Sequence, residues 1–354
     1  MRVLLNLISG QTMPVYIADQ ITNPEILTCL LTKQSETEYN NIVNSINKKI
    51  DEIEIPAFDF NKIKISLEEY ISKYLSKDDE LIFNFTGGTK IQSIALFQYA
   101  MENNYEAIYI NAESEEYIRF KNNNAVERKK YEVKIKPNTY LSLSGHKLDF
   151  SKINVTKNGQ KYLDLMEKYS KLFNPLITKG KINSRVLGSY FKVSIESIKV
   201  KLQVDGEVKL SFDSKLFDDF VVLGKGYWLE HLSAQKLKSI NQFDYVYSNL
   251  LIPRVNIANE GSYKNEIDIL AMHGTTPYIF ECKNKRIEKA DIDKLNYLKR
   301  TYFGRYCKLF FIGTFPPSST IQEALSDYQI SFINFYQLSN FLSSYDFSSN
   351  PNLK

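Results

Sequence analysis

The chain reads Asn265-Glu-Ile-Asp-Ile-Leu-Ala-Met-His-Gly-Thr-Thr-Pro-Tyr-Ile-Phe-Glu-Cys-Lys283, in which two short apolar runs flank His-Gly-Thr-Thr-Pro. The runs, Ile267–Met272 and Tyr278–Cys282, have the length and composition of strands. The residues between them predict a hairpin with a loop somewhat longer than a tight turn. Because side chains alternate between the two faces of a strand, we expect Glu281 and Lys283 to point to one side and the residue between them to point into the core.

This hairpin carries acidic groups on both of its strands, Asp268 on the first and Glu281 on the second. Two carboxylates on paired strands form a hard oxygen site of the kind that Mg²⁺ or Mn²⁺ prefers. Lys283 beside them would orient or deprotonate a water and balance the charge of a phosphate. The pattern therefore predicts metal-assisted hydrolysis of a phosphodiester. The same residues also occur on ordinary solvated strand faces, so this alternative stays open.

A helix is predicted upstream, where Gly226-Tyr-Trp-Leu-Glu-His-Leu begins an apolar arc at about 100° per residue. The arc contains Trp228, Leu229, Leu232, Leu237 and Ile240. Glu230 lies at the border of this arc, from which its carboxylate can reach inward toward a sheet. A surface glutamate at the edge of a packed helix is the alternative. With the hairpin downstream, we favour a role in the same site.

Composition places the chain among globular proteins, because 43% of its 354 residues are hydrophobic and 24% are charged. This length is sufficient for two or three domains with cores of their own. No apolar run approaches a membrane span and the sequence begins directly on a strand, so we expect a cytoplasmic protein that does not enter a membrane. The net charge of +4 permits nucleic-acid binding without proving it.

The three cysteines, Cys29, Cys282 and Cys307, are widely spaced within strand-like apolar runs. This spacing indicates buried free thiols and excludes a zinc site or a disulfide framework. A metal site in this chain would therefore use oxygen ligands.

The first 112 residues alternate strands with helices, which predicts a Rossmann-like parallel sheet. The expected strands are Arg2–Ser9, Glu25–Thr32, Glu52–Ala57, Glu80–Phe85 and Glu106–Ala112, and the expected helices are Glu36–Lys49, Ser66–Leu75 and Thr89–Asn103. Ligands of such sheets bind beyond the carboxyl ends of the strands.

Two loops at this edge have the chemistry of an anion site: Ser9-Gly10-Gln11-Thr12 and Thr86-Gly87-Gly88-Thr89-Lys90. The second joins a buried strand to a helix, so its backbone N–H groups and the helix N-terminus favour a phosphate, with Lys90 adding charge. A turn that needs glycines for backbone reasons alone is the alternative. The loop has neither the dinucleotide-binding nor the Walker pattern, which argues against a dinucleotide cofactor and an NTPase.

The two segments Asn6-Leu-Ile-Ser-Gly-Gln-Thr and Asn84-Phe-Thr-Gly-Gly-Thr-Lys-Ile resemble the CARF domain of CRISPR-associated effectors. Together with Glu230, Asp268 and the Glu281-Cys-Lys283 sequence, they resemble the type III CRISPR ancillary nucleases, which join a CARF sensor to a PD-(D/E)XK domain. The resemblance covers about the first 135 and the last 130 residues. The chain departs from the nuclease pattern at Ile267, where the family usually has proline.

This resemblance implies a homodimer that binds a cyclic oligoadenylate, usually the tetra-adenylate, and then cuts DNA or RNA with Mg²⁺ or Mn²⁺. It also implies that Glu230, Asp268 and Glu281 hold the metal and that Lys283 positions the attacking water. By position, the residues that would contact the activator are Ser9, Gln11, Thr12, Thr86, Gly87, Gly88, Thr89 and Lys90.

The expected domains are a CARF domain at 1–136, a connector at 137–220 and a PD-(D/E)XK nuclease domain at 221–354, all in an α/β chain. A nucleotide-sensing regulator that does not cut and a ring nuclease that degrades the activator are the alternatives. The sequence does not decide between DNA and RNA or fix the ring size. Basic side chains after the hairpin are candidates for phosphate contacts or for an ordinary solvated helix: Lys285, Arg286, Lys289, Lys294, Lys299 and Arg300.

Overall fold

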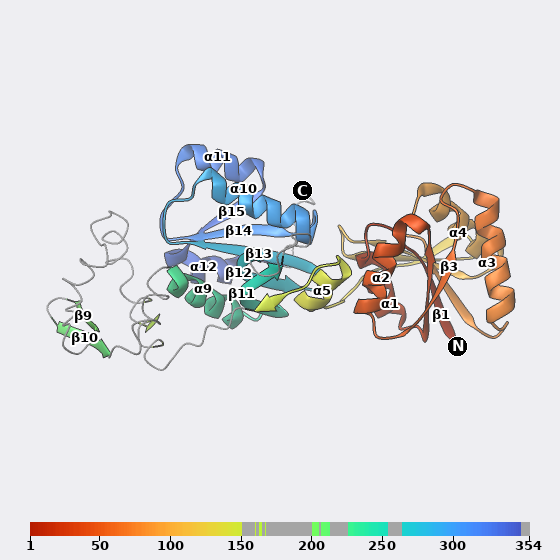
Figure 1. The fold of residues 1–354 in the computed structure, drawn as a ribbon, viewed down its shortest axis with the longest axis horizontal. Coiled ribbons are helices and arrows are strands. Elements are labelled where there is room, and N and C mark those ends of the chain that lie inside the picture. Colours follow the sequence, from red (N-terminus) through yellow and green to blue (C-terminus); the bar gives the residue numbers. More distant parts are fainter. Residues whose placement is uncertain are drawn as a thin grey trace. The chain divides into compact units, whose positions relative to one another are not determined.

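The computed structural model describes residues 1–150, 226–253 and 264–347, together with 200–204, 207–212 and the single residues 160, 163, 164 and 167. Contacts between Cα atoms divide the chain into two compact units, of which the first contains Met1–Leu148 and the second Asp149–Ser349. Each unit is a sheet with helices on its faces (Figure 1).

The first unit is built on a seven-stranded sheet in the order β3-β2-β1-β4-β5-β6-β7. The strands are β1 (Arg2–Leu7), β2 (Ile26–Leu31), β3 (Lys49–Glu54), β4 (Glu80–Asn84), β5 (Glu106–Asn111), β6 (Glu116–Lys121) and β7 (Asn124–Lys130). Neighbours among β1 to β5 are parallel, whereas β6 and β7 extend one edge as an antiparallel hairpin. The strand order reverses between β1 and β4, and such a switch point is where open α/β sheets bind ligands.

Helices cover both faces of this sheet, with α1 and α2 on one face and α3 and α4 on the other (Figure 1). The helices are α1 (Met13–Thr22), α2 (Glu36–Ser45), α3 (Phe60–Tyr74), α4 (Lys90–Glu102) and α5 (Pro137–Leu143), and a short 3₁₀ turn spans Lys33–Ser35. The core beneath α3 and α4 joins alternate residues of β1 to the helices through Val3, Leu5, Leu7, Ile63, Leu67 and Leu96. The Rossmann-like architecture expected from the sequence is confirmed.

Two elements of this unit differ from the sequence-based expectation. α1 was not expected, because most of its length is buried and it therefore lacks the alternation of polar and apolar faces that reveals a surface helix. β3 begins at Lys49 and ends at Glu54, earlier than the expected Glu52–Ala57. It is an edge strand with only one buried residue, so its hydrophobic pattern is weak.

The expected connector at 137–220 begins with α5, which belongs to the first unit and packs on α2, where Ser45 Oγ donates to Ser142 Oγ at 2.8 Å. Its strand β8 (Asp149–Phe150) belongs to the second unit, and β9 (Val200–Val204) and β10 (Glu207–Phe212) form a separate antiparallel pair. Most of its other residues lie outside the described part of the chain, so a connector remains a prediction.

The second unit has a six-stranded sheet in the order β15-β14-β13-β12-β11-β8. The strands after β8 are β11 (Tyr245–Pro253), β12 (Lys264–His273), β13 (Thr276–Lys283), β14 (Lys308–Gly313) and β15 (Ile330–Asn334). β8, β11, β12 and β13 are antiparallel in succession, whereas β13, β14 and β15 are parallel. The sheet is therefore mixed: β13 is antiparallel to its neighbour β12 and parallel to its other neighbour, β14.

The β12–β13 hairpin predicted from the sequence forms, but its loop is tighter than expected. His273 pairs with Thr276, so only Gly274 and Thr275 lie between the strands. Gly274 adopts a left-handed φ of 57°, and its N–H donates to Asp244 Oδ2 at 2.7 Å. Glycine in this conformation permits the short turn that the apolar pattern alone did not indicate.

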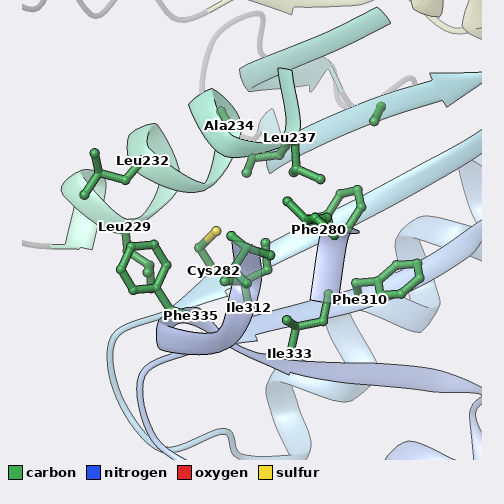
Figure 2. Packing of buried hydrophobic residues seen from close by; sticks show 14 of the residues in the cluster. Leu229, Leu232, Ala234, Leu237, Phe280, Cys282, Phe310, Ile312, Ile333 and Phe335 are labelled. Atoms are coloured by element: carbon green, nitrogen blue, oxygen red, sulfur yellow. The ribbon is translucent and has the colours of Figure 1, made fainter. Parts of the chain in front are cut away.

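Helices flank this second sheet on both faces, with α9 and α12 on one side and α10 and α11 on the other (Figure 1). They are α9 (Trp228–Ser239), α10 (Lys289–Leu298), α11 (Ser319–Asp327) and α12 (Leu338–Ser344); a π-helical turn (Lys299–Phe303) extends α10, and a 3₁₀ turn (Phe335–Gln337) precedes α12. Figure 2 shows Leu229 and Leu237 of α9 on the same cluster as Phe280 and Cys282 of β13. This packing fixes α9 against β13. No helix within the described ranges is both long enough and apolar enough to cross a membrane.

Candidate functional site

The candidate catalytic site of the second unit lies where β12 and β13 stop pairing. Their ladder runs from His273 and Thr276 to Ile269 and Phe280, and the next two positions in the same register are Asp268 and Glu281. β13 continues to Lys283 alongside β14. The Cys282 N–H donates instead to Asp268 Oδ2 at 2.7 Å. The ends of the ladder thus hold two buried carboxylates on adjacent strands.

Glu281 is bound by two ammonium groups on one side only. Its Oε1 accepts hydrogen bonds from Lys283 Nζ and from Lys294 Nζ, both at 2.9 Å. Its Oε2 is buried and has no hydrogen-bond partner among the described residues. Lys283 also pairs with Asp291 Oδ1 at 3.1 Å. Glu281 and Lys283 lie on one side of β13, and Cys282 lies in the core on the other, as the alternation of a strand predicts.

Glu230 on α9 interacts electrostatically with the same cluster. Burial raises the pKa of Glu230 to about 7, and the negative charges of Glu266 and Glu281 add to the effect. Burial likewise raises the pKa of Asp268 well above its usual range, and the charges of Glu281 and Glu230 raise it further. The negative charges of the three carboxylates named from the sequence therefore disfavour one another, in addition to the effect of burial.

Lys283 of the hairpin is positively charged in this arrangement. Burial alone would lower the pKa of Lys283, but the adjacent carboxylates of Glu281 and Asp291 outweigh burial and raise it. Lys283 consequently stays an ammonium ion at neutral pH. This charge suits the orientation of a water or the neutralisation of a phosphate better than proton abstraction.

The oxygen-rich cluster fits a hard divalent cation in its donor chemistry. As they stand, no three His, Cys, Asp or Glu side chains within the described ranges are grouped closely enough to hold a metal ion. The carboxylates of Glu230, Asp268 and Glu281 are nevertheless the donors that Mg²⁺ and Mn²⁺ prefer. The unpartnered Oε2 of Glu281 and the raised pKa values are two unfavourable features that a bound cation would relieve.

Asp291 and Lys294 of α10 belong to this cluster, although the sequence pattern did not assign them to it. Asp291 Oδ2 accepts the Glu288 N–H at 3.0 Å and closes a capping box at the start of α10, while its other oxygen pairs with Lys283. Residues three apart share a helix face, so Lys294 follows Asp291 toward Glu281. This spacing, combined with the lysine two residues after Glu281, is the signal that would have found them.

Asn249 of β11 is a further residue at this end of the sheet that sequence reasoning missed. Ser248 pairs with Ile269 and Leu250 with Ile267, so Asn249 lies opposite Asp268 in the register. It is buried, adopts a left-handed φ of 57°, and donates from Nδ2 to Tyr227 Oη at 3.3 Å. A strained polar residue inside a strand is uncommon, and such residues concentrate at functional sites.

In the first unit, the two glycine-containing loops lie next to each other at the switch point. β1 and β4 are adjacent and parallel, so both loops follow the same edge of the sheet. A Cβ atom placed on Gly87 would lie 2.6 Å from the Leu7 carbonyl oxygen and 3.2 Å from Ser9 Oγ. The structure thus brings together the loops Ser9–Thr12 and Thr86–Lys90.

Side chains of the predicted activator site divide into exposed groups and groups that shape the loops. Gln11, Gly88 and Lys90 are exposed, and Ser9 is half-buried. The three threonine hydroxyls donate to, or accept from, protein partners: Thr12 Oγ1 donates to Leu143 O (2.7 Å), Thr86 Oγ1 to Asn84 Oδ1 (2.6 Å) and Thr89 Oγ1 to Ala57 O (2.7 Å). Thr89 also caps α4 by accepting the Gln92 N–H.

Beneath these loops, Asn6 and Asn84 form a buried polar pair that links them. Asn84 Nδ2 donates to Asn6 Oδ1 at 2.9 Å and to the Pro14 carbonyl oxygen at 3.2 Å. Asn84 Oδ1 accepts from the Thr86 hydroxyl and its N–H. One side chain therefore ties β1, the start of α1 and the second loop together.

We predict that Gly87→Ala destabilises the first unit. Its Cβ would meet a backbone oxygen at 2.6 Å, so the backbone must move, at a cost on the order of 1–3 kcal/mol. Gly10→Ala is the matched control, because nothing lies within 4 Å of the added Cβ. Urea unfolding of both variants measures the effect, and equal midpoints for the two would contradict this contact.

We also predict a pH-dependent stability that originates at Glu230. Because the pKa of Glu230 is raised to about 7, the folded protein binds this proton more tightly than the unfolded chain does. The associated stability is complete below about pH 4.5 and is lost as the pH rises through about 7. Glu230→Gln does not titrate, so its free energy of unfolding should rise relative to that of the parent between pH 4 and pH 8.

Urea unfolding with a metal chelator at both pH values measures this difference. Glu323→Gln, which replaces an exposed glutamate of α11, is the control. A difference between Glu230→Gln and the parent that does not change with pH would show that folding does not raise the pKa of Glu230.

Comparisons with known proteins agree with this fold. Residues 3–140 match the family profile of the Card1 CARF domain. Can2 from Sulfobacillus thermosulfidooxidans, solved in complex with cyclic tetra-adenylate, is similar over 98% of this chain and 99% of its own, with a TM-score of 0.73 and 18% identity. Protein VC1899 from Vibrio cholerae is similar over 97% of this chain and 96% of its own, with a TM-score of 0.74 and 16% identity.

A type III CRISPR defence DNA nuclease activated by cyclic oligoadenylate is also similar, over 92% of this chain and 51% of its own, with a TM-score of 0.59 and 13% identity. No curated protein matches the chain. At these identities, the likeness to solved structures shows the fold and does not assign an activity. The chain therefore combines an N-terminal Rossmann-like CARF domain with a second α/β sheet domain, as Can2 does.

Proposed function

We propose that this protein is a metal-dependent endonuclease of type III CRISPR defence that a cyclic oligoadenylate activates, with cyclic tetra-adenylate as the expected ring. The observation that carries the proposal is Glu281, a buried carboxylate with two lysines on one oxygen and no partner on the other, beside Asp268. The CARF match supports the activator, and the similar structures include one with cyclic tetra-adenylate bound and one named as a nuclease.

In this proposal, the second unit is a PD-(D/E)XK nuclease domain. Glu230, Asp268 and Glu281 hold Mg²⁺ or Mn²⁺, which when bound polarises the phosphodiester and lowers the pKa of its water. Lys283 keeps its ammonium charge through Asp291 and Glu281, and it positions the attacking water and offsets charge on the phosphate. Asp291 fixes this lysine from the first turn of α10.

The proposed activator site lies over the two loops of the CARF domain. The phosphates and bases of the activator would contact the exposed groups of Ser9, Gln11, Gly88 and Lys90. The N–H groups at the N-terminus of α4 would bind a phosphate as well. Thr12, Thr86, Gly87 and Thr89 hold the loops in place through their internal contacts. A symmetric ring bound on a two-fold axis needs the same loops from two subunits, so we propose that the protein is a homodimer before activation.

Separate variants should remove sensing and cutting independently. Lys90→Ala loses a charge-assisted contact to a phosphate, worth about 1–3 kcal/mol, so activation should need roughly 5- to 150-fold more cyclic tetra-adenylate. Glu281→Gln keeps the shape of the side chain but removes its charge, and it should abolish cleavage while the affinity for the activator is unchanged.

Calorimetry with cyclic tetra-adenylate and cleavage assays on labelled single-stranded DNA, RNA and supercoiled plasmid with Mg²⁺ or Mn²⁺ measure both effects. Lys77→Ala, an exposed lysine remote in sequence from both loops, is the control. Cleavage by Glu281→Gln at the parental rate would place the active site elsewhere, and a normal response of Lys90→Ala would remove the sensor assignment. A parent protein that cuts nothing with any metal would favour a regulator or a ring nuclease.

A further inference from the structure

The two lysines on Glu281 are held differently. Lys283 is 16% exposed and pairs with both Glu281 and Asp291. Lys294 is 41% exposed, and its described partner is Glu281 Oε1. Both ammonium groups share one oxygen, so they repel each other at the carboxylate that also faces Asp268. Lys294 would therefore break one described ion pair on leaving, whereas Lys283 would break two, and the side chain of Lys294 is the more exposed to water.

A divalent cation at Glu281 changes this balance. Its charge would take over the neutralisation that the two lysines now supply and would repel both of them. Asp291 retains Lys283, because its Oδ1 pairs with that lysine while its Oδ2 is fixed by the Glu288 N–H. Among the described residues, no second carboxylate forms an ion pair with Lys294.

We propose that Lys294 is an exchangeable counter-ion of the active site: it neutralises Glu281 while the metal is absent, leaves when a divalent cation binds there, and then contacts the phosphodiester backbone of the nucleic-acid substrate. This inference rests on the proposed function and adds a residue and a step to it. Before the metal binds, Lys294 helps to neutralise the buried charge of Glu281. After release, its ammonium group is already close to the position where a phosphate of the substrate would bind. Metal and lysine compete for one carboxylate.

Lys294→Met keeps most of the aliphatic length of the side chain and removes the charge. Calorimetric titration of the full-length protein with Mn²⁺ alone, without nucleic acid, should show tighter metal binding by on the order of fivefold, the value expected for loss of one partly exposed ion pair. Lys294→Arg, which keeps the charge, should bind Mn²⁺ as the parent does. Lys289→Met is the control for a charge loss on the same helix, at an exposed residue outside the cluster.

The second half of the inference is measured with a labelled single-stranded oligonucleotide, saturating Mn²⁺ and cyclic tetra-adenylate. Lys294→Met should raise KM, and the slope of log KM against log salt concentration between 50 and 200 mM KCl should fall by about one, as for loss of one phosphate contact. Lys294→Arg should restore both values.

Three results would overturn the inference. Unchanged or weaker Mn²⁺ binding by Lys294→Met removes the exchange, while the proposed function stands if Glu281→Gln still loses cleavage. Tighter Mn²⁺ binding with an unaltered KM and salt slope removes the phosphate contact. Absence of Mn²⁺ binding by the parent protein overturns both this inference and the proposed metal site.

Discussion

Repulsion between the buried carboxylates of Asp268 and Glu281 is the constraint on which the second unit depends. Charges placed so close together and away from water are costly unless other groups neutralise them. The fold offsets the cost from several elements: the Cys282 N–H serves Asp268, and Lys283 and Lys294 serve Glu281. The compensation is incomplete, because the pKa values of Asp268 and Glu230 remain raised. The surrounding protein groups therefore compensate the ionised forms of these carboxylates only in part.

In the first unit, buried contacts hold the two loops against each other and leave their outer surface exposed. Asn84, buried beneath the loops, makes these contacts by donating to Asn6 and to the Pro14 carbonyl oxygen. Lys90 stays exposed to solvent. Gly87 permits the close approach of the second loop to β1. A buried and fully paired asparagine is rigid, so a ligand of these loops would meet a preformed surface, which would lower the entropic cost of binding.

Sequence reasoning reached the parts of this structure that depend on local periodicity. Alternation along β13 places Glu281 and Lys283 together, and the succession of strands and helices predicts the Rossmann-like sheet. It missed α1, because a helix buried on most sides has no polar face, and the tight turn at Gly274, because a left-handed φ is not visible in a hydrophobic pattern. Asn249 was missed since its position opposite Asp268 depends on strand register.

The hydrogen bond between Cys282 and Asp268 in the candidate site can be observed by spectroscopy. The Cys282 N–H is held by a carboxylate at 2.7 Å, at the point where the ladder between β12 and β13 ends. A short hydrogen bond from an amide to a carboxyl oxygen draws the amide proton downfield in a nuclear magnetic resonance spectrum. An ion that bound Asp268 would change the charge on the acceptor of this bond and would therefore shift the resonance. The backbone amide of Cys282 is therefore an intrinsic reporter of the state of Asp268, and reading it requires no turnover.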